Sequence, residues 1–244
     1  MKVVCIVQAR MGSSRLPGKV LKEICGKSVL EHVIYRLRLI NNIDEIIIAT
    51  TNLERDNQII KECEKIGVKY FRGSEDNVLS RYYYAAKENN ADIVVRITSD
   101  CPLIDYKISQ DIIQYYLDNA KKYDYISNTI ERTYPRGLDT EVFSFNALEV
   151  AFKEAVSNRD LEHVTPYIWD NSKVFKIAQY KNDKDYSELR WTLDTKEDLE
   201  LIENIYENLY NHMNSQFVFE DILNLYNQYP ELYNMNKHIM QKHI

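Results

Sequence analysis

A short loop near the start of the sequence carries the residue types that bind phosphate. It follows the apolar run 3–7 and combines cations with small residues, namely Arg10, Gly12, Ser13, Ser14, Arg15, Gly18 and Lys19. Backbone N–H groups and hydroxyls of such a loop can face an anion, and Arg and Lys neutralise its charge. Residues 1–40 contain eight Lys or Arg and two acidic residues, although the whole chain has a net charge of −6. The pattern predicts an anion site, with a sheet-edge turn carrying solvated charges as the structural alternative.

The spacing in this loop differs from two well-known phosphate motifs. A Walker A loop needs Gly, four residues and then Gly-Lys-Ser/Thr. Here five residues separate Gly12 from Gly18, and Val20 stands where the hydroxyl should be. No G-x-G-x-x-G sequence occurs in the chain, so the dinucleotide fingerprint is absent.

Two aspartates stand where predicted strands end. Asp100 follows the apolar run 92–97, and Asp194 follows a predicted strand at 188–193. A carboxylate at the carboxyl end of a strand is well placed to meet a ligand, and Mg²⁺ commonly takes one or two protein carboxylates. The alternatives are structural: Asp100 would cap a helix, and Asp194 would support the turn before the Thr195-x-x-Asp198 helix cap.

The opening loop, Asp100-Cys101-Pro102-Leu103-Ile104 and Asp194-Thr195-Lys196-Glu197-Asp198-Leu199 together resemble motifs of the sugar nucleotidyltransferases. The resemblance is greatest to the cytidylyltransferases that make CMP-activated sugar acids, and among these to the spore coat polysaccharide biosynthesis proteins F. It implies that Arg10, Arg15 and Lys19 hold the triphosphate in catalysis, and that Asp100 and Asp194 bind Mg²⁺. Lys196 departs from the family pattern, which has proline there.

The same resemblance implies further binding residues. The loop after a predicted strand at 68–71 would frame the nucleobase, and the expected nucleotide-binding residues are Ala9, Arg10, Gly12, Ser13, Lys19, Arg72, Gly73, Ser74, Arg81 and Asp100. Expected acceptor-binding residues are Arg136, Asp139, Glu141 and His163. Arg136 offers a planar fork for a carboxylate or phosphate, whereas a lone histidine such as His163 is often satisfied by its neighbours.

Composition narrows the class of protein. The chain has 244 residues, 45% hydrophobic and 28% charged, and its calculated pI is about 5.5, which argues against nucleic acid as the main partner. No apolar run reaches the ~20 residues that span a bilayer, and the first strand is too short for a signal peptide. Four scattered cysteines without C-x-x-C spacing are typical of a cytoplasmic protein. Cys101, next to Asp100, is the one that we examine further.

Strand-like and helical segments alternate through the first half of the chain. Apolar patterns predict strands at 2–8, 45–50, 68–71 and 92–97, and helices at 29–40, 54–66, 77–89 and 106–119. Ser28-x-x-Glu31 is typical of a helix start, and Gly67 of a helix end. Continuous apolar strands between helices predict an α/β fold, a Rossmann-like, mainly parallel sheet with helices on both faces. The resemblance specifies the nucleotide-diphospho-sugar transferase type.

The middle segment, 124–193, departs from this alternation. It predicts short strands at 124–127, 140–143, 174–180 and 188–193, and helices at 145–156 and 159–170. In similar families this region supplies the acceptor pocket and an arm that grips a second subunit, so we expect a homodimer. We expect residues 1–210 to form the nucleotidyltransferase domain, with 124–193 as an excursion, and 211–244 to form a helical tail.

The predicted reaction is transfer of CMP from CTP to an anionic acceptor, a sugar acid or a phosphorylated small molecule, with release of pyrophosphate. A role in surface polysaccharide biosynthesis follows from the resemblance. The alternatives are a glycosyltransferase of similar sheet architecture and a non-catalytic nucleotide-binding module. The residues alone leave the acceptor open, and they do not separate CTP from another triphosphate.

Overall fold

The computed structural model describes residues 1–213 and 216–241. Its elements, in chain order, are β1 (Val3–Gln8), η1 (Lys19–Leu21), β2 (Glu23–Ile24), β3 (Lys27–Ser28), α1 (Val29–Leu37), β4 (Glu45–Thr51), η2 (Glu54–Asp56), α2 (Asn57–Ile66), β5 (Lys69–Gly73), α3 (Val78–Glu88), β6 (Ile93–Thr98), α4 (Tyr106–Asp118), β7 (Tyr125–Ser127), β8 (Glu141–Ser144), α5 (Phe145–Glu154), α6 (Asn158–His163), α7 (Pro166–Asp170), β9 (Ile177–Gln179), α8 (Lys196–Met213), α9 (Phe219–Gln228) and α10 (Leu232–Asn236).

A seven-stranded sheet with the order β5-β4-β1-β6-β8-β7-β9 runs through the described part of the chain. β8 is antiparallel to both of its neighbours, and every other pairing is parallel. The predicted α/β fold with a mainly parallel sheet is therefore confirmed. Since β1 lies between β4 and β6, the loop that leaves β1 is close to the carboxyl ends of both.

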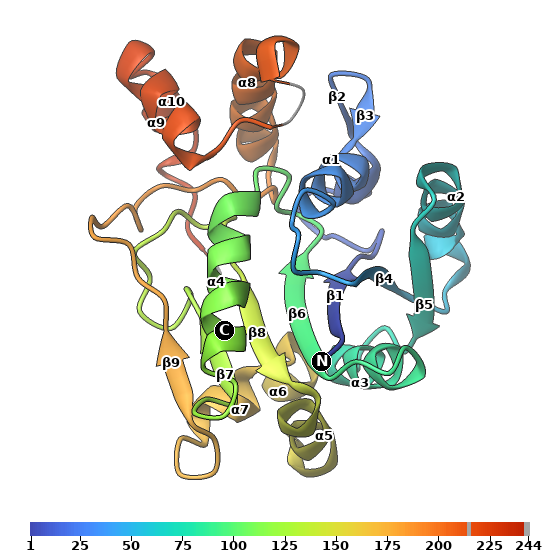
Figure 1. Cartoon of the computed structure of the whole chain (residues 1–244). Coiled ribbons are helices and arrows are strands. Elements are labelled where there is room, and N and C mark those ends of the chain that lie inside the picture. The colour runs from blue at the N-terminus through green and yellow to red at the C-terminus, as the bar shows by residue number, and fades with distance from the viewer. Residues whose placement is uncertain (214–215, 242–244) are drawn as a thin grey trace.

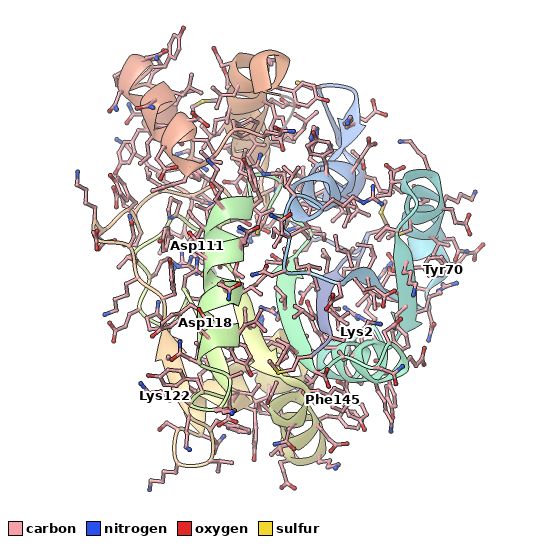
Figure 2. The ribbon with its side chains drawn as sticks, viewed as in Figure 1. Lys2, Tyr70, Asp111, Asp118, Lys122 and Phe145 are labelled. Atoms are coloured by element: carbon pink, nitrogen blue, oxygen red, sulfur yellow. The ribbon has the colours of Figure 1, made fainter. Side chains whose placement is uncertain are left out.

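Side chains of the central strands alternate between two hydrophobic layers. Val3, Cys5 and Val7 of β1 pack with α1, α2 and α4, whereas Val4 and Ile6 pack with α3 and α5 on the other face. Helix α4 illustrates the pattern: it buries Ile112, Ile113 and Tyr116, and presents Asp111 and Asp118 to solvent (Figure 2). Both faces of the sheet are thus covered by helices, as the apolar strands predict.

A third hydrophobic cluster lies at the end of the molecule where α8, α9 and α10 gather (Figure 1). It surrounds Trp191, whose side chain is fully buried, and includes Leu103 from the segment after β6. This cluster packs the region around Asp194 against the segment that carries Asp100.

Local sequence signals form as predicted. The Ser28 hydroxyl accepts a hydrogen bond from the Glu31 N–H at the start of α1, and Gly67 ends α2 with a φ of 63°. The cap of α4 is Asp105, which accepts from the N–H groups of Lys107 and Ile108, and not Asp100, for which the sequence offered capping as an alternative role.

The middle segment differs from its prediction in two elements. The sequence predicts one helix at 159–170, but the structure has two. Val164 adopts a φ of 73°, which is not helical, so the helix is interrupted between α6 and α7. The strand expected at 188–193 is wrong: apart from one isolated bridge, Arg136 with Arg190, the segment pairs with loops instead of strands. Backbone hydrogen bonds to Arg136 and Asp100 hold residues 188–193 extended, but they do not form the regular ladder of a β-strand pair.

The predicted excursion is continuous with the main sheet. Strands β7, β8 and β9 of the middle segment extend the sheet beyond β6, with β9 at the edge. The described part of the predicted tail is helical, although α8 runs past residue 210 to Met213, and residues 214–215 and 242–244 lie outside the described residues. The domain boundaries themselves stay predictions.

None of the helices in residues 1–213 and 216–241 has the length and apolar character to cross a membrane.

Candidate active site

A cleft of about 560 Å³ opens beside the carboxyl ends of β1 and β6. Its walls come from the loop after β1, the segment after β6, residues 136–139, the end of α6, residues 192–194 and the C-terminal segment. The predicted site residues that line it are Ala9, Arg10, Gly12, Ser13, Arg15, Lys19, Arg81, Asp100, Arg136, Asp139, His163 and Asp194. Segments far apart in the sequence therefore meet in one place, as a mainly parallel sheet predicts.

The loop after β1 folds back on itself. The carbonyl of Met11 accepts hydrogen bonds from the N–H groups of Ser13 and Gly18, and the Met11 N–H donates to the buried Asp56 carboxylate at 2.7 Å. None of the described residues accepts a hydrogen bond from the N–H groups of Gly12, Ser14 or Arg15. Because these three residues line the cleft and no described residue takes up their N–H groups, the groups remain available to a ligand.

Lys19 joins the two predicted metal ligands. Its Nζ donates to Asp100 Oδ2 at 2.6 Å and to Asp194 Oδ1 at 2.8 Å. Burial disfavours the ammonium, but the two carboxylates outweigh this effect and raise the pKa of Lys19. Burial likewise favours the neutral acid of Asp100, yet Lys19 lowers the pKa of that carboxyl. Both groups are therefore charged at neutral pH.

Asp194 is surrounded by cations. Its Oδ2 lies 2.8 Å from Arg15 and 3.0 Å from Arg190. The predicted Thr195-x-x-Asp198 cap forms at the start of α8: the Thr195 hydroxyl accepts from the Asp198 N–H, and the Asp198 carboxylate accepts from the N–H groups of Asp194 and Thr195. The carboxylate of Asp194 takes no part in this cap, and Asp194 lines the cleft.

The donor set around Lys19 suits a hard divalent cation. No group of three or more His, Cys, Asp or Glu in residues 1–213 and 216–241 could hold a metal ion. Mg²⁺ needs only one or two carboxylates when water and phosphate supply the remaining ligands. The carboxylates of Asp100 and Asp194, which already converge on the Lys19 ammonium, meet this requirement.

The predicted base-binding loop lies behind the cleft. The Arg72 guanidinium donates to the carbonyls of Thr51 and Leu53, and Arg72, Gly73 and Ser74 are not among the lining residues. Arg81 does line the cleft, and it donates to the carbonyls of Ser74 and Glu75. A Cβ at Gly73 would come within 2.8 Å of the Arg81 side chain, so this glycine makes room for Arg81.

Arg136 and Asp139 lie at another wall of the cleft, with different environments. Asp139 forms a two-pronged ion pair with Arg132. The half-buried Arg136 has no carboxylate within ion-pair distance in the described part of the chain, although its backbone bonds to residues 189 and 191. Its guanidinium is thus available to an anionic ligand.

Glu141 does not line the cleft. Its carboxylate accepts hydrogen bonds from Arg96 and from the Tyr125 hydroxyl, the latter at 2.7 Å. Arg96 lines the cleft in its place and also donates to Gln8. Glu141 therefore supports Arg96 from behind, and as the residues lie here its own carboxylate has no direct path to a ligand.

His163 and Cys101 have distinct surroundings in the cleft. The Thr165 N–H donates to the His163 carbonyl at 2.9 Å, and with the φ of 73° at Val164 this forms a strained γ-turn that ends α6. Burial lowers the pKa of His163, which is therefore neutral at pH 7. Burial and the adjacent Asp100 raise the pKa of Cys101 well above its ordinary value, so Cys101 stays a thiol and is a poor nucleophile.

The prediction from sequence omitted several lining residues. Gln8, Arg96 and Thr98 stand at the ends of β1 and β6, where their position after an apolar run was the available signal. Arg190, which contacts Asp194, and Gln241, which lines the cleft, carry no motif that marks them.

Comparison with known proteins finds similarity to nucleotidyl-transferring enzymes. A family model described as "Cytidylyltransferase" matches residues 4–222. The chain is 38% identical to an uncharacterized protein of Methanocaldococcus jannaschii, over 99% of this chain and 97% of that protein. It is 32% identical to the spore coat polysaccharide biosynthesis protein SpsF of Bacillus subtilis, over 84% and 86%. The structure of a cytidylyltransferase from Leptospira borgpetersenii superposes with a TM-score of 0.92 at 33% identity, covering all of both chains.

Residues 136–137 cross residues 191–192 so closely that replacing Gly137 should lower the stability of the fold. Gly137 has a φ of 106°, and a Cβ there would lie 2.6 Å from the backbone of Trp191. Gly67 also has a positive φ, but nothing lies within 4 Å of its Cβ position. We expect Gly67→Ala to cost about 1–2 kcal/mol in the free energy of unfolding, and Gly137→Ala to cost at least ~2 kcal/mol more. Urea unfolding measures both, and equal losses would contradict the crossing.

Proposed function

The chain belongs to the cytidylyltransferase family, and on that premise we propose that it transfers CMP from CTP to an anionic small-molecule acceptor. The acceptor would be a sugar acid or a phosphorylated small molecule used in surface polysaccharide biosynthesis, and pyrophosphate would be released. One observation carries the proposal: a single cleft contains a loop with available N–H donors and two carboxylates that meet at Lys19.

The loop after β1 would hold the triphosphate. Within the described residues the ion pairs of Arg10 are long, 3.9 Å to Glu75 and 3.7 Å to Glu162, so its guanidinium can turn to phosphate at little cost. Arg15 and Lys19 are now bound to carboxylates, and phosphate oxygens would compete for them as charge-assisted acceptors. The N–H groups of Gly12 and Ser14 would add neutral donors.

Asp100 and Asp194 would hold Mg²⁺ once Lys19 gives up its contacts with them. The ion would supply positive charge beside the phosphates, which stabilises charge that develops on them in the transition state. Arg190 would keep Asp194 oriented through its other oxygen.

The acceptor would bind near Arg136 and His163. The guanidinium of Arg136 fits a carboxylate or phosphate, and neutral His163 can accept a proton or a hydrogen bond from a hydroxyl. The oxygen of the acceptor attacks the α-phosphorus of CTP, the bond to the β-phosphate oxygen breaks, and pyrophosphate leaves. The protein mainly positions the two reactants for in-line displacement.

We also propose a homodimer through the middle segment. Val156 and Val174 of this segment are 87% and 63% exposed, and β9 is an edge of the sheet. An unpaired edge strand offers backbone N–H and C=O groups to another chain, and Val174 stands three residues before β9. Light scattering at tens of micromolar protein should give twice the chain mass of 28.9 kDa, and a monomer mass would exclude the dimer.

The reaction is tested by pyrophosphate release with each of the four triphosphates against a panel of anionic acceptors. We expect turnover with CTP, magnesium dependence, and no nucleoside diphosphate, which a glycosyltransferase would release. Asp100→Asn and Asp194→Asn should each lower turnover roughly a hundredfold or more, since each removes a ligand of the charge-neutralising ion.

Asp198→Asn is not a suitable control because Asp198 is buried with Arg190, so Asp111→Asn on the exposed face of α4 serves instead. Near-normal turnover of Asp100→Asn or Asp194→Asn would show that the substituted aspartate is not a metal ligand. Turnover with another triphosphate in preference to CTP would contradict the assigned base.

Substituting two arginines of the cleft should distinguish the binding site of the nucleotide from that of the acceptor. Arg10→Ala is expected to weaken CTP binding about tenfold, because it removes a charge-assisted contact to phosphate. Arg136→Ala should leave CTP binding nearly unchanged and raise the KM for the acceptor or lower kcat. Calorimetry with CTP alone compares the two variants, and equal losses of CTP affinity would show that the two residues serve one site.

A further inference from the structure

The C-terminal segment reaches the cleft. Gln241 lies among the lining residues, and its Oε1 accepts a hydrogen bond from a terminal nitrogen of Arg190. The segment is anchored upstream by Asn236, which is 4% exposed and donates to the Arg190 carbonyl at 2.9 Å and to Asp198 Oδ1 at 2.8 Å. Leu232 packs into the hydrophobic cluster around Trp191. The segment is thus docked by both apolar and polar contacts.

Arg190 is the link between this segment and the proposed metal site. Its guanidinium is buried, with the side chain 5% exposed, and it bonds to Asp198 through Nε and one terminal nitrogen. That same terminal nitrogen donates to Asp194 Oδ2 at 3.0 Å. The other terminal nitrogen donates to Gln241. Each nitrogen of the guanidinium therefore has an acceptor, and its orientation is set from three directions.

We propose that Gln241 is a positioning residue, which orients Asp194 through Arg190. The proposal rests on the role of Asp194 as a metal ligand in the proposed function. By holding one terminal nitrogen, Gln241 keeps Arg190 from offering a further N–H to Asp194. The oxygen of Asp194 that now accepts from Lys19 then has no second bond to Arg190 and can pass from the lysine to a metal ion in the cleft.

The physical reason lies in the cost of an unsatisfied donor. A buried guanidinium nitrogen without an acceptor seeks the nearest carboxylate oxygen. For Arg190 these are the oxygens of Asp198, already bonded, and of Asp194. Without the Gln241 carbonyl, Arg190 would bind Asp194 more closely and compete with a metal for it.

The experiment measures Mn²⁺ affinity of the full chain by electron paramagnetic resonance, with and without CTP and in the absence of an acceptor. Gln241→Met keeps the length of the side chain but removes the acceptor, and Gln241→Glu keeps an acceptor oxygen. We expect Gln241→Met to weaken Mn²⁺ binding in the CTP complex about three- to tenfold. This is less than the roughly 10- to 100-fold loss typical of residues that touch a metal ligand. Gln241→Glu should retain the affinity.

Gln216→Met is the matched control, since Gln216 lies in the same C-terminal part of the chain and bonds to Tyr35 outside the cleft. Its Mn²⁺ affinity should equal that of the wild type, and melting temperatures should be alike in all variants. Unchanged Mn²⁺ affinity in Gln241→Met overturns the positioning role, and so does a loss of affinity that is accompanied by a lowered melting temperature, because general destabilisation would then account for it. Absence of CTP-dependent Mn²⁺ binding in the wild type overturns the proposed metal site itself, and this inference with it.

Discussion

The contact of Lys19 with Asp100 and Asp194 is the interaction on which the site depends. Two carboxylates that share a cleft repel each other, and one of them would take up a proton unless a cation lay between them. Lys19 supplies that cation, and its effect lowers the pKa of Asp100. The price of this arrangement is that the lysine must exchange partners when a ligand arrives, which suits a site built for a charged substrate and its counter-ion.

Most other charged groups of the cleft are also paired in advance. Asp139 is bound by Arg132, Arg96 by Glu141, which lies outside the lining, and Asp194 by Arg15 and Arg190. Such pairs keep buried charges compensated and hold side chains in a defined geometry before a ligand binds. The exceptions are as informative as the pairs. Arg136, without a carboxylate partner in the described residues, and the available N–H groups of the opening loop mark where anions can enter.

The backbone around Trp191 connects these charges. Residues 189–193 receive hydrogen bonds from, or donate to, the backbone of Arg136 and Asp100. The crossing requires glycine at position 137, because a Cβ there would meet the Trp191 backbone. Through this short extended segment the acceptor wall, the segment after β6 and the start of α8 are held at fixed distances. The C-terminal helices pack over it, and in this way a part of the chain without chemical motifs contributes to the site.

The sequence by itself determined the sheet, its helices and the members of the site that carry a local signal. The spacing of apolar residues and the apolar runs predicted the parallel strands and their helices. Gly and Ser after β1 and Asp after β6 stand at the ends of strands, and the topology of the sheet brings these ends together. Only the tertiary structure decided which side chains bond to one another and which backbone segments lie side by side. The sequence predicted Glu141 as a binding residue and did not mark Arg96, yet Arg96 lines the cleft, and the Glu141 carboxylate is bonded to Arg96 and to the Tyr125 hydroxyl. The strand expected at 188–193 failed because its backbone partners are loops. Arg190 and Gln241 join the site through contacts across 51 residues of chain, and no local pattern encodes a contact of that range.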